Sequence, residues 1–139
     1  MEILQKEFSL KQKSRGFHLI TDEILNNISE ILSIKIGTVN LFIKHSSASL
    51  TINENCDSSV RTDMENYIND VISNKSYFEH IYEGNDDMPA HIKSSFFGVS
   101  LSIPITNGKL NLGTWQGIYL GEHRNFGGRR KVVATIIGI

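Results

Sequence analysis

The feature that most constrains the fold is the pair Asn107-Gly108, which lies between two apolar runs in the C-terminal half of the chain. Asparagine followed by glycine favours a tight turn in which both residues take positive φ angles, and such a turn joins adjacent antiparallel strands. We therefore predict a hairpin in which strands at residues 98–105 and 110–112 flank a turn at residues 106–109.

Two helices are predicted from apolar side chains that recur at helical spacing. The first begins at Thr21, a candidate N-cap, and runs through about residue 32. The second begins after a cap at Asp57 or Ser58, and we expect it to end near Asn74. Its apolar stripe is the clearest in the chain: Val60, Met64, Tyr67, Ile68, Val71 and Ile72. A short helix is also predicted from Pro89 through about residue 95.

The remaining segments alternate apolar and polar residues, which is typical of strands. These predicted strands cover residues 2–12, 39–44, 48–53, 115–122 and 131–139. Strands joined by short turns pair antiparallel, so the order favours an α+β fold: an antiparallel β-sandwich or open barrel with two main helices packed against it. Residues 132–137 are apolar on both faces of their strand, and we expect burial on both sides, with a second subunit covering one.

Composition bounds the class of protein. The 139 residues suit a single domain over residues 1–139, and the formal net charge of -1 gives no overall attraction to nucleic acid or acidic membranes. One cysteine, Cys56, excludes an internal disulfide. No apolar run approaches the roughly 18 residues of a membrane helix, and the N-terminus lacks a signal-peptide pattern. We expect a cytoplasmic protein with no nucleic-acid or membrane partner.

The richest candidate site lies at residues 85–93, where Asp86, Asp87, His91 and Lys93 fall within nine positions. Carboxylates and imidazole bind divalent metals together, and they also exchange protons near neutral pH. The alternative interpretation is a solvated acidic turn that caps a short helix. No His-Glu-x-x-His zinc signature is present.

Two other histidines have suggestive settings. His45 follows a predicted strand and precedes a polar run, a common location for site residues. His123 lies between residues of opposite charge near a strand end. His18 and His80 have weaker settings, and we expect ordinary structural or surface roles for them.

Two further polar groups flank the predicted elements. Residues 53–57, which include Glu54, form either a helix-capping loop or part of a site. Residues 122–131 combine glycines with arginines, a composition that suits phosphate or carboxylate groups but also an ordinary basic turn. Standard nucleotide-binding glycine loops are absent.

Four of these stretches together, residues 45–48, 53–57, 85–95 and 113–124, resemble the YjbQ family, also called the secondary thiamine-phosphate synthase type. The resemblance covers nearly the whole chain and keeps the motifs in order. It implies a sandwich-like α+β fold, assembly as a homotrimer and a polar cleft at or near the subunit interface.

The resemblance and the residues together give an expected site. Expected catalytic residues are His45, Asp87, His91, Glu122 and Arg124. Expected ligands of a divalent metal, zinc or magnesium, are His45, Asp87, His91 and His123. Expected contacts to an anionic or phosphorylated small molecule are Lys93, Gln116, Arg129 and Arg130.

Three functions follow as hypotheses. The first, implied by the resemblance, joins hydroxymethylpyrimidine diphosphate to a thiazole phosphate and releases pyrophosphate, whose charge cations must neutralise. The second is metal-assisted hydrolysis, since histidines suit zinc better than magnesium, which prefers oxygen ligands. The third is a non-enzymatic trimer that binds a metal or an anion.

Overall fold

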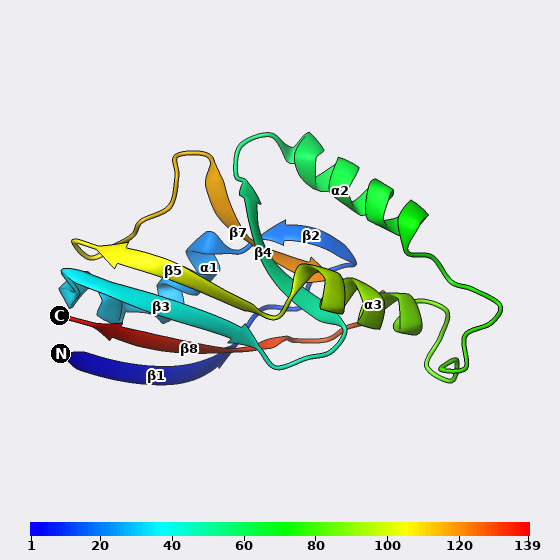
Figure 1. Cartoon of the computed structure of the whole chain (residues 1–139), viewed down its shortest axis with the longest axis horizontal. Helices are drawn as coiled ribbons and strands as arrows, with labels where there is room; N and C mark the ends of the chain where they lie inside the picture. Colours follow the sequence, from blue (N-terminus) through cyan, green and yellow to red (C-terminus); the bar gives the residue numbers. More distant parts are fainter.

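The computed structural model, which describes residues 1–139, contains two antiparallel sheets with helices packed against them (Figure 1). The predicted fold class is therefore confirmed. The five-stranded sheet has the order β1 (Glu2–Ser9), β8 (Lys131–Gly138), β3 (Ile36–Ile43), β5 (Ser100–Thr106) and β6 (Lys109–Leu110). The three-stranded sheet has the order β2 (Gly16–Leu19), β7 (Gln116–Glu122) and β4 (Ala48–Glu54).

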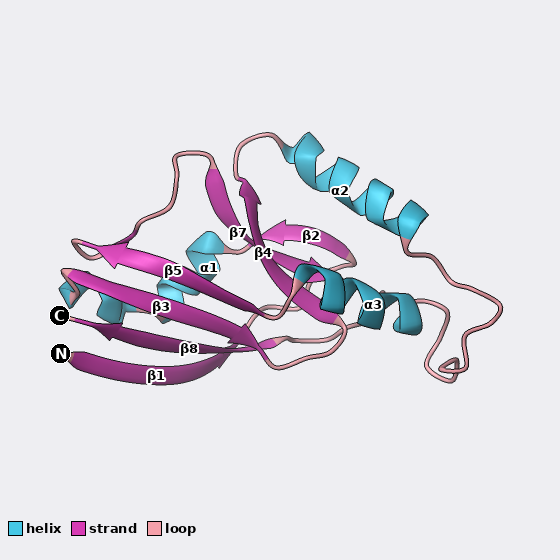
Figure 2. Cartoon of the chain, viewed as in Figure 1, coloured by secondary structure: helices cyan, strands magenta, loops and turns pink.

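The helices cover different parts of these sheets. Helix α1 (Thr21–Asn27) and the 3₁₀ helix η1 (Ser29–Ser33) lie behind the five-stranded sheet in the view of Figure 1. Helix α2 (Ser58–Val71) packs on β2, and α3 (Asp87–Phe97) packs on β4. The segment that joins α2 to α3 is a loop at one end of the molecule (Figure 2).

Two apolar cores hold these layers together. The larger one lies between the inner faces of the two sheets and includes α1 and η1; its members include Ile24, Ile31, Leu41, Leu50, Ile118 and Ala134. The smaller one joins the three-stranded sheet to α2 and α3 through Phe17, Ile68, Ile72 and Tyr119. Side chains that alternate along β7 therefore supply both cores, because successive residues of a strand face opposite sides: Ile118 and Leu120 lie in the larger core and Tyr119 in the smaller one.

The predicted hairpin is confirmed. β5 pairs with β6, and the turn residues have positive φ angles of 50° at Asn107 and 77° at Gly108. The predicted cap of α2 is also confirmed, because Asp57 Oδ1 accepts a hydrogen bond from Ser59 N at 2.9 Å. Glu54 Oε2 accepts a hydrogen bond from Asp57 N, so residues 53–57 form the capping loop.

Several predicted boundaries were wrong. Thr21 is the first helical residue and not a cap, because its Oγ1 accepts a hydrogen bond from Ile118 N in β7. The helix ends at Asn27 and continues as a separate 3₁₀ turn. Helix α3 begins at Asp87, which places Pro89 in its first turn, where no backbone N–H is needed.

Other differences concern the strands and the end of α2. The first strand ends at Ser9, and the short strand β2 was not predicted because it has only four residues. Helix α2 ends at Val71, so Asn74 lies in the following loop.

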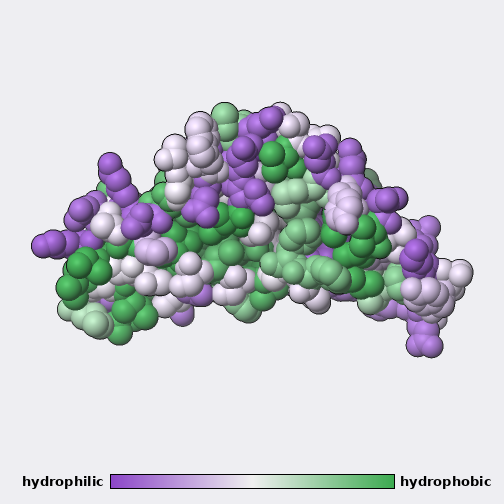
Figure 3. All heavy atoms as spheres, turned by 45° about the horizontal axis from the view of Figure 1, so that its top comes forward, coloured by the Kyte–Doolittle hydropathy of each residue, from purple (hydrophilic) through white to green (hydrophobic).

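The outer face of the five-stranded sheet has no helix over it (Figure 1). On β8, Val132, Ala134 and Ile136 are buried in the core, whereas Ile137 on the other face is 44% exposed. Exposed apolar side chains gather near the end where the two chain termini lie (Figure 3). No helix is long and apolar enough to cross a membrane.

Candidate functional site

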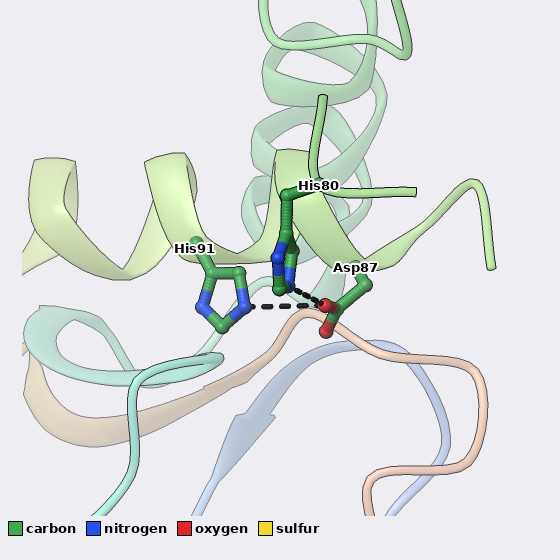
Figure 4. A group of neighbouring side chains, drawn as sticks. All are labelled: His80, Asp87 and His91. Carbon is green, nitrogen blue, oxygen red and sulfur yellow. Dashed lines mark hydrogen bonds and ion pairs between the residues drawn. The ribbon is translucent and has the colours of Figure 1, made fainter. Parts of the chain in front are cut away.

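The candidate site is a cluster of His80, Asp87 and His91, whose side chains point toward one another (Figure 4). His80 lies in the loop before α3, Asp87 is the first residue of α3, and His91 follows one helical turn later. Asp87 Oδ2 lies 2.7 Å from His80 Nε2 and 3.2 Å from His91 Nε2. The helix and the loop thus bring two imidazoles to one carboxylate oxygen.

Asp87 is the residue that contacts both histidines of the cluster, and its own position is held by Arg124. Its side chain is 1% exposed, and its second oxygen, Oδ1, pairs with Arg124 Nη1 at 2.9 Å. Burial opposes ionisation, but the contacts with His80, His91 and Arg124 outweigh it and hold the pKa of Asp87 below its usual value. A solvated acidic turn, the alternative interpretation of this segment, does not describe a carboxylate that is buried in this way.

His91 carries an informative pair of contacts. Its Nδ1 lies 2.8 Å from the carbonyl oxygen of Ser46, which can only accept a hydrogen bond, so Nδ1 carries a proton. Its Nε2 faces Asp87 Oδ2, which is also an acceptor because the carboxylate is ionised. Both contacts are satisfied by an imidazolium, or by a neutral imidazole whose Nε2 lone pair shares a cation with Asp87.

Arg124 and Asp86 hold the start of α3 in place. Arg124 Nε donates to Asp86 Oδ2 at 3.2 Å, and the backbone N–H of Asn125 donates to the same oxygen at 2.9 Å. Burial acts against these bonds but does not cancel them, so the pKa of Asp86 is also lowered. Arg124 therefore positions both adjacent aspartates, since it pairs with Asp87 as well.

The donor set of the cluster fits a zinc-type divalent ion. The potential ligand atoms of His80, Asp87 and His91 all lie within 4.8 Å of one another. Two imidazole nitrogens and one carboxylate oxygen are typical ligands of zinc in catalytic sites, whereas magnesium prefers oxygen. The contact of His91 Nδ1 with the Ser46 carbonyl is the kind of second hydrogen bond that orients a ligating histidine.

His45 lies near this cluster but is not part of it. Its Nε2 accepts a hydrogen bond from Lys131 N at 2.8 Å, and burial, with Arg130 next in size, lowers its pKa. His45 and Ser46 line an open groove of about 790 Å³ that runs along α3 past Ser94 and Ser95. The structure therefore places His45 where a bound molecule could touch it, without making it a neighbour of Asp87.

His123 is a core residue and lies outside the cluster. It is 1% exposed, and its ring packs against Phe17 and Phe97. Its Nε2 lies 2.8 Å from Ser49 Oγ, while Nδ1 is buried without a hydrogen-bond partner. Burial, together with the charges of Lys93 and nearby arginines, lowers the pKa of His123 to about 3.

Glu122 and Arg130 pair with each other inside the protein. Arg130 Nε donates to Glu122 Oε1 at 2.8 Å, and Arg130 Nη2 lies 2.5 Å from Oε2. Both residues are buried, and Arg130 also donates to the carbonyl of Ser47. This bidentate pair ties β7 to the start of β8 and leaves neither side chain directed at His80, Asp87 and His91.

The other expected substrate contacts are dispersed. Gln116 is exposed and accepts a hydrogen bond from Gly113 N, and Arg129 donates to the carbonyl of Leu10. Lys93 is buried on α3 beside Asn69, and burial is the largest of the effects that lower its pKa. Of the expected site residues, the structure thus brings together Asp87, His91 and Arg124.

His80 is the residue that sequence reasoning missed. It lies seven positions before Asp87 in a loop without periodicity, so its spacing gave no reason to pair it with the helix. The only available signal was its proximity in sequence to the acidic pair.

Comparison with known proteins gives consistent matches. The chain matches a family model described as UPF0047 protein YjbQ-like over residues 6–139. It is 53% identical over 134 residues to UPF0047 protein YjbQ of Escherichia coli O157:H7, covering 96% of this chain and 97% of the relative. The protein of the same name from Salmonella typhimurium is 54% identical over 134 residues, with the same coverage.

Solved structures show the same fold. A YjbQ/UPF0047 family protein from Clostridium acetobutylicum superposes with a TM-score of 0.82 at 38% identity, covering 95% of this chain and 99% of that one. A protein of unknown function from Sulfolobus solfataricus superposes with a TM-score of 0.83 at 24% identity, covering 99% of both chains. This chain belongs to the YjbQ-like UPF0047 family.

Proposed function

We propose that the protein is a metal-dependent enzyme that hydrolyses a small anionic molecule at the cluster of His80, Asp87 and His91. The observation that carries the proposal is the position of His91, whose two ring nitrogens both face hydrogen-bond acceptors, Ser46 O and Asp87 Oδ2. A divalent cation between His91 Nε2 and Asp87 would resolve the second contact, and His80 Nε2 would complete a three-residue ligand set.

The chain's own groups have defined tasks in this proposal. Asp87 supplies the negative charge, and Arg124 holds its other oxygen so that Oδ2 faces the histidines. The Ser46 carbonyl keeps the proton of His91 on Nδ1 and leaves Nε2 free as a ligand. When bound, a zinc-type ion in such a three-ligand site supplies Lewis acidity and lowers the pKa of coordinated water to about 7.

His45 is the candidate hydrogen-bond donor to the bound molecule. It lines the groove beside α3 and directly precedes Ser46 in the sequence, and the carbonyl oxygen of Ser46 orients His91. Its lowered pKa keeps the imidazole neutral at neutral pH. Because Nε2 accepts a hydrogen bond from Lys131 N, the ring carries its proton on Nδ1 and can donate it in a hydrogen bond to a bound molecule. Glu122, in contrast, is fully engaged with Arg130 and supports the fold in this proposal.

The test measures metal and turnover together. Protein stripped with a chelator is titrated with Zn²⁺, Co²⁺ and Mg²⁺, and then assayed against phosphate and carboxylate esters. We expect one Zn²⁺ or Co²⁺ per chain and hydrolysis that requires it, with both lost in His80→Ala and His91→Ala. His18→Gln is the matched control, because His18 binds the Ser14 carbonyl outside the cluster. Full metal binding in His91→Ala would refute the assignment.

A transferase that forms thiamine phosphate, the activity implied by the resemblance, is the second candidate. It is favoured by the grouping of Arg124 with Asp86 and Asp87, because diphosphate chemistry uses cations and carboxylates together. Incubation with the two precursors, with Mg²⁺ and then with Zn²⁺, distinguishes it from hydrolysis. Turnover near one per second would identify it as the main activity, and only trace product would exclude it as such.

We also propose that the protein assembles as a homotrimer. The support is the uncovered outer face of the five-stranded sheet, where Ile3, Phe42 and Ile137 are exposed. Exposed apolar side chains on one sheet face favour burial against another chain. A second subunit on this face would cover the side of β8 that the single chain leaves open.

A further inference from the structure

A second polar pocket lies at the N-terminal part of α3, apart from the cluster of His80, Asp87 and His91. Its volume is about 240 Å³, and ten residues line it, four of which are asparagines. Sites for drug-sized ligands occupy about 300–1,000 Å³ and are mostly apolar. This pocket is smaller and polar, so it suits one charged group and not a whole apolar ligand.

Lys93 places a positive charge in this pocket. The residue is 2% exposed, and its Nζ donates to Asn69 Oδ1 at 2.5 Å. No carboxylate oxygen lies within 4.0 Å of that Nζ. An ammonium group has three donors, so two remain without a protein partner. A buried cation that lacks a counter-ion is costly, and a bound anion would remove that cost.

Arg15 adds a second positive charge on the same side. Its Nη2 donates to Asn69 Oδ1 at 3.1 Å, so one amide oxygen is shared by both cations. Its Nη1 donates to Asn125 Oδ1 at 3.4 Å, and its Nε lies 3.5 Å from Glu65. Asn69 Nδ2 in turn donates to Glu65 Oε1, so Glu65 is the carboxylate that pairs with Arg15.

Asp86 also lines the pocket, but its charge is already compensated. Its Oδ2 accepts from Arg124 Nε and from the backbone of Asn125. The positive charges of Lys93 and Arg15 therefore exceed the free negative charge around them. The side-chain amides of the asparagines supply further donors of the kind that bind phosphate oxygens.

We propose that this pocket binds a small oxyanion, namely phosphate or the phosphate group of a larger molecule, between Lys93 and Arg15. The proposal does not depend on a metal at His80, Asp87 and His91. The two positions are nevertheless linked, because Asp86 in the pocket wall and Asp87 in the cluster are neighbours held by the same arginine, Arg124.

The test uses inorganic phosphate and the full chain in the presence of a chelator, at constant ionic strength. Calorimetric titration should show saturable binding of one phosphate per chain. Arg15→Gln should weaken it at least about tenfold, because it removes a charged hydrogen bond. Lys35→Gln is the control: it removes the same charge from an exposed lysine outside the pocket and should leave binding unchanged.

Two further variants keep the result unambiguous. Lys93→Gln can impair folding because the residue is buried, so Asn69→Asp serves as a second probe: its added negative charge should abolish phosphate binding in a folded protein. His91→Ala should keep wild-type phosphate affinity, which separates this pocket from the proposed metal centre. Unchanged affinity in both Arg15→Gln and Asn69→Asp, or no saturable binding to the wild type, would overturn the proposal.

The same titration distinguishes the source of the phosphate. A phosphate monoester that competes with inorganic phosphate and binds more tightly would identify the pocket as the anchor of a larger molecule. Equal or weaker binding of the monoester would assign the pocket to the free ion.

Discussion

The buried imidazole of His123 makes the stability of the fold depend on pH below neutrality. In the unfolded chain an imidazole takes up a proton near pH 6.5. In the folded protein the pKa of His123 is lowered to about 3, first by burial and then by the charges of Lys93 and nearby arginines. Between these two values the unfolded state binds one more proton than the folded state, so the free energy of unfolding falls as the pH falls.

The magnitude follows from the linkage relation. One proton of difference changes the free energy of unfolding by about 1.4 kcal/mol per pH unit. Because the unfolded imidazole is only partly protonated at pH 7, the contribution of His123 falls by about 2 kcal/mol between pH 7 and pH 5. The neutral imidazole of His123 gives its full contribution to the free energy of unfolding well above pH 6.5, and this contribution is lost progressively as the pH falls toward 3.

The assay is urea unfolding at pH 7 and pH 5, with the free energy extrapolated to water. His123→Phe keeps an aromatic ring beside Phe17 and Phe97 but cannot titrate. We expect it to lose less stability on acidification than the wild type, by about 2 kcal/mol. Ser49→Ala removes the hydrogen bond to His123 Nε2 while keeping the imidazole, so it should lower stability at both pH values and keep the slope.

The comparison between variants isolates His123, because every other histidine contributes equally to both proteins. Wild type and His123→Phe that lose stability in parallel, within about 0.5 kcal/mol, would refute the reasoning. The imidazole would then be either accessible to protons or charged in the folded state.

Three further predictions follow from particular contacts. Gly127→Ala should lower the free energy of unfolding by about 1–3 kcal/mol in urea unfolding, because the added Cβ would lie 2.3 Å from the buried Glu122 Oε1. Gly113→Ala is the control: its added Cβ would face the flexible side chain of Gln116, so it should lower the free energy of unfolding by about 0.5 kcal/mol or less. Ile137→Glu should convert the proposed trimer to a monomer of 15.6 kDa by light scattering, since Ile137 lies on the open sheet face; a wild-type monomer would contradict this. Zinc at about 100 times its Kd should stabilise the wild type by about 2.7 kcal/mol in thermal unfolding and leave His80→Ala unchanged.

Much of the fold could be predicted because local chemistry determines it. The Asn107-Gly108 turn requires two positive φ angles, and the structure has them. The apolar stripe predicted for α2 matches the packed face only in part: Ile68 and Ile72 lie in the smaller core, whereas Tyr67 and Val71 are 70% and 51% exposed. The misplaced boundaries lie where tertiary contacts override local preference, as at Thr21, whose hydroxyl binds a backbone group of β7.

The candidate site divides along the same line. Asp87 and His91 could be paired from the sequence because one helical turn separates them and places both on one face of α3. Glu122 and Arg130 were assigned to the site from charge and family resemblance, but the sequence does not reveal that both side chains are buried. Only the packing of β7 against the start of β8 shows that the two charges neutralise each other.

His80 shows why the rest of the candidate site could be identified only from the three-dimensional structure. A loop residue takes its position from the path of the chain, and the loop from α2 to α3 folds back so that Nε2 reaches Asp87 Oδ2. His45 and His123 have settings in sequence that look at least as functional, yet one bonds a backbone N–H of β8 and the other lies in the aromatic core. Residue type and flanking charge are therefore weak predictors of ligands when several histidines are present. A stronger criterion is whether both ring nitrogens of a histidine face hydrogen-bond acceptors, as they do in His91, and this criterion leads to the proposed centre at His91 and Asp87.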